Sequence, residues 1–90
     1  MVDFKNIEKN VRLIIASQLG ISIDNVKIDS KIKEDLGASS LDIIDFLLSI
    51  EDFFVIEILE HPYTKWNTVK DIIDYLKEKM LIQTIRIYRG

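Results

Sequence analysis

The sequence predicts an all-α fold, a bundle of three long helices and one short helix with a long loop after the first helix. Apolar residues recur at the spacing of an amphipathic helix in three separate stretches, each preceded by a capping side chain. The chain has 90 residues, of which 48% are hydrophobic, so it has the length and apolar content of one small domain with its own core.

The first predicted helix follows Asp3 and ends at Gly20. The Asp3 side chain can accept a hydrogen bond from a free amide at the helix start, and glycine adopts the left-handed conformation common at helix ends. The predicted core face of this helix consists of Phe4, Ile7, Val11, Ile14 and Ile15.

Between Gly20 and Leu36, residues 21–30 show a partial alternation of apolar and polar side chains that could be scored as one or two short strands. We interpret them as a long ordered loop, because two isolated short strands are only marginally stable. Its apolar side chains are expected to hold the loop on the helices: Ile21, Val26, Ile28 and Ile32.

The second predicted helix, over about residues 40–52, carries two apolar stripes when it is wound at about 100° per residue. The predicted core stripe consists of Ile43, Phe46, Leu47, Ile50 and Phe54. The opposite stripe, here called the outer stripe, consists of Leu41, Ile44 and Leu48. One alternative is that the outer stripe packs under the flanking loops, and the other, which we favour, is that it is a docking surface with an acidic rim.

Residues 59–66 are interrupted by Pro62 and predict a single turn or a short third helix. His61 is interpreted as a surface residue without chemistry, and Trp66 as part of the core. The last helix begins at Asn67 or Thr68, with a core face of Val69, Ile72, Ile73, Leu76 and Met80.

The C-terminal residues 81–90 are too apolar for a disordered end, but their pattern does not distinguish a helix extension from a strand. We expect at least part of this segment to pack on the domain.

The net charge of −3 is unevenly distributed along the chain. Residues 29–63 carry nine acidic and two basic side chains, whereas residues 64–90 carry three acidic and six basic ones. An acidic middle section favours basic partner surfaces and disfavours nucleic acid, although it is equally compatible with an ordinary solvated face. No apolar run approaches the roughly 20 residues of a membrane span, and cysteine is absent. These features predict a cytoplasmic protein, and we expect it to be a monomer.

The sequence contains few of the motifs that are typical of catalytic sites. The three glycines are scattered, so no glycine-rich phosphate loop is present, and no metal-ligand spacing occurs. Asp29, Glu34 and Asp35 could hold a divalent cation weakly, but solvated carboxylates are the preferred interpretation. We therefore predict that the protein is not an enzyme.

Residues 34–42, EDLGASSLD, run from a polar turn directly into the second helix. Gly37 permits a sharp turn, and Ser39 is a good N-cap with Asp42 three positions later. Ser40 then falls in the first turn, where free amides and the partial positive charge of the helix end would favour a phosphate ester. On capping chemistry alone, however, both serines could simply cap the helix.

This motif resembles the signature of acyl carrier proteins, in which the serine of an Asp-Ser-Leu sequence carries 4′-phosphopantetheine. The resemblance covers roughly residues 7–79 and implies that Ser40 is the attachment serine. Ser39 stands where the family usually has Asp, which bears on how well a standard phosphopantetheinyl transferase accepts this chain.

The resemblance also implies an acyl carrier domain over residues 1–80, with residues 81–90 as a C-terminal extension. Its partners would be a phosphopantetheinyl transferase and enzymes with basic patches that transfer or modify acyl thioesters, as in fatty acid or polyketide biosynthesis. The implied docking residues are Leu41, Asp42, Ile44, Asp45, Leu48, Glu51, Asp52 and Glu57. Two alternatives stay open: a peptidyl or aminoacyl carrier, and an unmodified helical interaction module.

Overall fold

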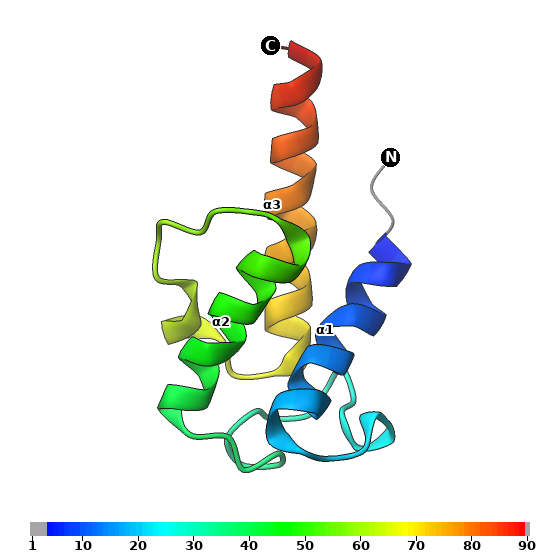
Figure 1. The fold of residues 1–90 in the computed structure, drawn as a ribbon, viewed down its shortest axis with the longest axis vertical. Helices are drawn as coiled ribbons and strands as arrows, with labels where there is room; N and C mark the ends of the chain where they lie inside the picture. The colour runs from blue at the N-terminus through cyan, green and yellow to red at the C-terminus, as the bar shows by residue number, and fades with distance from the viewer. Residues whose placement is uncertain (1–3, 90) are drawn as a thin grey trace.

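The computed structural model describes the backbone of residues 4–89 and the side chains of residues 6–82. Within this range the fold is all-helical and contains no β-strand, which confirms the all-α part of the prediction (Figure 1). The helices are α1 (Phe4–Leu19), η1 (Ile23–Asn25), α2 (Ser40–Phe54), η2 (Pro62–Lys65) and α3 (Val69–Arg89), of which η1 and η2 are short 3-10 helices.

Helix α1 packs against both α2 and α3 and runs antiparallel to them (Figure 1). Helices α2 and α3 point in the same direction, because residues 55–68 return the chain to the end of the molecule where α2 begins. This arrangement brings the start of α2, η2 and the start of α3 to one end of the bundle.

The core lies between the three predicted apolar faces. Burial of a large aliphatic or aromatic side chain stabilises a fold by about 1.5–3 kcal/mol, so these faces determine how the helices pack. The side chains of Ile14, Phe54 and Met80 are partly buried against the core, and that of Phe4 is outside the described side chains. The other predicted core residues are buried: Ile7, Val11, Ile15, Ile43, Phe46, Leu47, Ile50, Val69, Ile72, Ile73 and Leu76.

The loop between α1 and α2 is ordered, as predicted. The Arg12 guanidinium donates to the carbonyls of Val26 (2.6 Å) and Ile23 (3.1 Å), and the Val26 and Ile32 side chains are fully buried. The prediction for Ile28 was wrong, because its side chain is 41% exposed. Ile28 helps to hold the loop on α3 through its backbone carbonyl instead.

The same loop completes the start of α3. The free amides of Val69 and Lys70 donate to the carbonyls of Ser30 (3.1 Å) and Ile28 (2.8 Å). Thr68 caps the helix as predicted: its hydroxyl accepts from the Asp71 amide at 3.3 Å, and the Asp71 carboxylate accepts from the Thr68 amide at 2.9 Å. The loop therefore supplies partners to amides that a helix start leaves unpaired.

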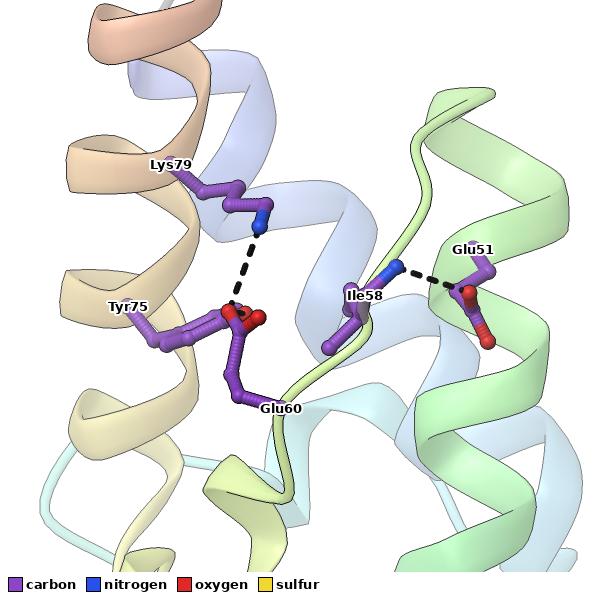
Figure 2. A network of polar contacts seen from close by, with 5 residues as sticks. All are labelled: Glu51, Ile58, Glu60, Tyr75 and Lys79. Carbon is purple, nitrogen blue, oxygen red and sulfur yellow. Dashed lines mark hydrogen bonds and ion pairs between the residues drawn. The ribbon is translucent and has the colours of Figure 1, made fainter.

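The segment between α2 and α3 is attached to both helices by carboxylates (Figure 2). Glu51 of α2 accepts from the Ile58 amide at 2.9 Å, and Glu60 accepts from the Tyr75 hydroxyl and, at 3.2 Å, from the Lys79 ammonium. Where a turn or short third helix was predicted, the structure has the 3-10 helix η2.

Trp66, which follows η2, is buried as predicted. Its ring makes an edge-to-face contact with Tyr75 at a centroid distance of 5.7 Å. His61 is exposed, also as predicted.

Helix α3 continues through Arg89, so the last described residues extend the helix rather than form a strand. Leu81 and Ile82 are about half exposed, at 48% and 49%. We expected part of residues 81–90 to pack on the domain. The side chains of residues 83–90 lie outside the described ones. In Figure 1 the end of α3 projects beyond α1 and α2.

Candidate functional site

Ser40 is the first residue of α2, and a sharp turn places it there. Gly37 has φ +72°, a left-handed conformation that residues with a side chain rarely adopt. The Gly37 and Ala38 amides donate to the carbonyls of Lys33 and Ile32, both at 3.1 Å, and the Ala38 side chain is buried. The turn is therefore fixed by its own hydrogen bonds and by the core.

The capping of α2 is performed by Ser39 and not by Ser40. The Ser39 hydroxyl accepts from the Asp42 amide at 3.1 Å, while the Asp42 carboxylate accepts from the Ser39 amide at 2.8 Å. This is the capping box expected from the sequence. It leaves the exposed Ser40 hydroxyl without a capping role.

The Ser40 hydroxyl instead accepts a hydrogen bond from the Lys33 ammonium at 3.1 Å. A cation and the free amides of a helix start thus lie beside the same oxygen, an arrangement that suits an oxygen bearing a phosphate ester. The residues present therefore fit a phosphate-linked group at this position.

A hollow of about 280 Å³ opens beside Ser40, between the start of α2 and η2. Its walls include the apolar side chains of Ile43, Ile44, Tyr63 and Trp66. A group attached to Ser40 would have this partly apolar surface next to it.

The outer stripe of α2 is unequally covered. Leu41 and Leu48 are 74% and 55% exposed, whereas Ile44 is partly buried and lines the hollow beside Ser40. The alternative, in which the outer stripe packs under the flanking loops, therefore applies to part of the Ile44 side chain. It does not apply to Leu41 or Leu48, which are exposed.

The predicted acidic rim contains two kinds of carboxylates. Asp45, Asp52 and Glu57 are exposed. Asp42 and Glu51 accept hydrogen bonds from the backbone amides of Ser39 and Ile58, so both stabilise the fold whatever else they do.

The apolar surface continues from α2 onto α1. Leu13 and Phe53 are about half exposed, at 47% and 52%, and line an open hollow of about 580 Å³ between the two helices. Asp52 lies in the same lining. Phe53 thus adds apolar area next to the rim.

The most perturbed carboxyl group is distant in sequence from Ser40. Hydrogen bonds from the Tyr75 hydroxyl, the backbone and the Lys79 ammonium lower the pKa of Glu60 from 4.5 to about 2. Burial and the adjacent Glu60 carboxylate raise the pKa of Tyr75. Glu60 lines a hollow of about 440 Å³ together with Glu57, Leu59 and Glu78.

In the segment of Asp29, Glu34 and Asp35, where solvated carboxylates were preferred over a weak cation site, one carboxylate is bound to the backbone. The Asp35 carboxylate accepts from the Lys31 amide at 2.8 Å. Among the residues that the structure describes, no group of three potential ligands could hold a metal ion, and no helix is long and apolar enough to cross a membrane.

Two residues near the site were not found from the sequence. Lys33 reaches Ser40 only because the intervening turn folds back, and Gln18 of α1 donates its side-chain amide to the Asp42 carbonyl at 3.0 Å. Neither contact leaves a periodic signal, since each joins a helix end to a side chain elsewhere in the chain.

Comparisons with known proteins show which family the chain resembles. A family profile described as a phosphopantetheine attachment site matches residues 9–76. The acyl carrier protein of Chlamydia trachomatis serovar D is 40% identical over 74 residues, which are 82% of this chain and 96% of that protein. The acyl carrier protein of Phytoplasma mali is 38% identical over 70 residues, which are 78% of this chain and 83% of that protein. The acyl carrier protein of Campylobacter hominis is 42% identical over 69 residues, which are 77% of this chain and 87% of that protein. The chain therefore belongs to the acyl carrier protein family, whose members carry 4′-phosphopantetheine and are carriers rather than catalysts.

Proposed function

We propose that this protein carries acyl groups as thioesters on a 4′-phosphopantetheine arm attached to the Ser40 hydroxyl. The observation that carries the proposal is the position of this hydroxyl. It is exposed at the first residue of α2, it is not used for capping, and it lies 3.1 Å from a lysine ammonium.

The attachment reaction would join Ser40 Oγ to the β-phosphorus of coenzyme A. The new Oγ–P bond replaces the P–O bond of the pyrophosphate, so adenosine 3′,5′-bisphosphate leaves, and the hydroxyl proton passes to a base of the transferase. The arm then supplies a thiol for thioester formation, while partner enzymes supply the catalysis.

The outer stripe and the exposed rim acids form the proposed docking surface. Leu41 and Leu48 offer exposed apolar contacts, with Ile44 at the edge of the hollow beside Ser40. The exposed carboxylates of Asp45, Asp52 and Glu57 suit partners with basic patches, because complementary charges speed association. We assign Asp42 and Glu51 to this surface as contributors to its field, in addition to their contacts within the fold.

The proposed partners are a phosphopantetheinyl transferase and enzymes that load, transfer or modify acyl groups. We propose a monomer, since the exposed apolar stripe is assigned to those enzymes and not to a second copy. The proposed location is the cytoplasm, where the thiol of the arm would stay reduced.

We propose η2 as the short helix of a four-helix carrier bundle, on the basis of its place between α2 and α3. In the same proposal, residues 1–80 form the carrier domain and residues 81–90 are an extension. Helix α3 crosses that boundary without interruption.

The test is the mass of the intact protein after incubation with coenzyme A and a transferase. We expect one phosphopantetheine per chain in the wild type and in Ser39→Ala, and none in Ser40→Ala. An unmodified wild type, tested with several transferases, would contradict the carrier proposal and favour an interaction module that only binds partners.

A further inference from the structure

The backbone that carries Lys33 is held in place by hydrogen bonds. The backbone on either side of it is held: the Ile32 amide donates to the Asn67 carbonyl at 2.9 Å, and the Lys33 carbonyl accepts from the Gly37 amide at 3.1 Å. Its ammonium donates to Ser40 Oγ at 3.1 Å. The side chain is exposed, so only its own rotamers limit the approach of the ammonium to a group on Ser40.

Among the residues that the structure describes, no carboxylate forms an ion pair with the Lys33 ammonium. The preceding residue, Ser39, is neutral, and the Asp42 carboxylate accepts from the Ser39 amide. The Asp35 carboxylate accepts from the Lys31 amide. Glu34, which shares the lining of the hollow with Lys33 and Ser40, is the remaining acidic side chain of the turn.

We infer that Lys33 binds the phosphodiester of the arm once Ser40 is modified. This inference rests on the proposed attachment to Ser40. A phosphodiester on Oγ places negatively charged oxygens two bonds beyond the atom that Lys33 already contacts, and a hydrogen bond between two charged groups would replace a bond to a neutral hydroxyl. The helix start contributes its partial positive charge at the same point.

The contact has a consequence for the arm. A phosphate held by both Lys33 and the start of α2 loses part of its rotational freedom, and the ammonium covers one side of the ester. We therefore expect slower release of the arm by a phosphodiesterase than from a carrier that lacks this lysine.

The experiment compares Lys33→Gln with Lys31→Gln. Both remove one positive charge from an exposed side chain of the same turn, and the amide of residue 31 can still donate to Asp35 in the control. Each variant is converted fully to the phosphopantetheine form and purified, so the rate of the transferase reaction does not enter the comparison. The readouts are the ³¹P chemical shift and relaxation of the phosphodiester, and the rate of arm release by a non-specific phosphodiesterase.

We expect Lys33→Gln to change the ³¹P shift, to increase the mobility of the phosphate and to speed release by about two- to fivefold, the range of an exposed ion pair. Lys31→Gln should match the wild type. In the wild type, modification should shift the ε-methylene signals of Lys33 more than those of Lys31.

Equal ³¹P shifts and release rates in Lys33→Gln and the wild type would overturn the inference while leaving attachment at Ser40 intact. Equal effects of the two variants would also overturn it, because they would indicate only a general field. If the wild type carries no arm on Ser40, the proposed function is wrong and the inference falls with it.

Discussion

Ser39 and Asp42 pair reciprocally at the start of α2, with the Ser39 hydroxyl on the Asp42 amide and the Asp42 carboxylate on the Ser39 amide. Because this pair performs the capping, two adjacent serines have separate tasks, and the Ser40 hydroxyl faces Lys33 and solvent.

The first prediction separates the two serines by stability and modification. Loss of an N-cap side chain costs about 1 kcal/mol, so Ser39→Ala should lower the free energy of unfolding by about that amount and still be modified at Ser40. Ser40→Ala should stay within about 0.5 kcal/mol of the wild type and accept no arm. Urea denaturation and peptide mapping measure the two effects, and phosphopantetheine on Ser39 would contradict the assignment.

The second prediction compares neighbouring leucines on opposite faces of α2. Leu47 is 8% exposed and Leu48 is 55% exposed. Leu47→Gln places a polar group in the core, so it should cost at least the roughly 2–5 kcal/mol of a buried leucine truncation or prevent folding. Leu48→Gln should leave denaturation almost unchanged and weaken turnover by the transferase or an acyl-loading enzyme. Equal destabilisation by both substitutions would remove the outer stripe from the docking surface.

The third prediction compares two adjacent rim acids. Asp52 is exposed, so Asp52→Asn should slow association with a basic partner, reduce the salt dependence of that rate and leave stability unchanged. The Glu51 carboxylate accepts from the Ile58 amide, and its removal in Glu51→Ala should cost roughly 1.5–3 kcal/mol. Stopped-flow association and urea denaturation distinguish the two roles. A stability loss in Asp52→Asn, or none in Glu51→Ala, would reverse them.

The fourth prediction concerns the end of α2. Val55 has φ +54°, a left-handed conformation that a β-branched residue adopts at a cost, and its side chain is 84% exposed. Val55→Gly should therefore raise the free energy of unfolding by about 1 kcal/mol, since little burial is lost. Val55→Thr, which keeps the branched side chain, is the matched control and should show no gain. Chemical denaturation of the three proteins tests this, and a less stable glycine variant would show that no strain is stored there.

The fifth prediction concerns the pH dependence of the Glu60 contacts. The folded protein holds the pKa of Glu60 at about 2, below the usual 4.5, chiefly through the hydrogen bond from Tyr75. A lowered pKa in the folded state means that the stabilisation is present above about pH 4.5 and is lost as the pH falls towards 2. Tyr75→Phe should raise the pKa of Glu60 in a carboxyl ¹³C titration and flatten this part of the stability profile.

Tyr63→Phe is the control for the fifth prediction, because it removes a tyrosine hydroxyl that is not bonded to Glu60. It should leave the Glu60 titration unchanged. If Tyr75→Phe has no more effect than Tyr63→Phe, the Tyr75 hydroxyl does not control this carboxyl group.

The helices and their buried faces could be predicted from the sequence, because the spacing of apolar residues reports which side of a helix excludes water. Ile43, Phe46, Leu47 and Ile50 illustrate this, as does the cap at Ser39. Ile28 was misjudged, since its alternating pattern says nothing of the backbone hydrogen bond to Lys70 that holds the loop there.

Only part of the candidate site could be predicted from the sequence, because only part of it depends on a local pattern. The position of Ser40 follows from a local motif, whereas the contacts of Lys33 and Glu51 join a side chain to a partner seven residues away. Such contacts depend on the path of a turn, and on the left-handed Val55 in the case of Glu51. Local patterns do not specify that path.

The end of α3 projects from the bundle and lies far from the start of α2, where Ser40 is located. The start of α2 lies at the opposite end of a molecule about 42 Å long (Figure 1). A surface, a resin or a fused protein joined after the helix would therefore be held away from the start of α2. Such a carrier could be immobilised and still present its serine to a soluble enzyme.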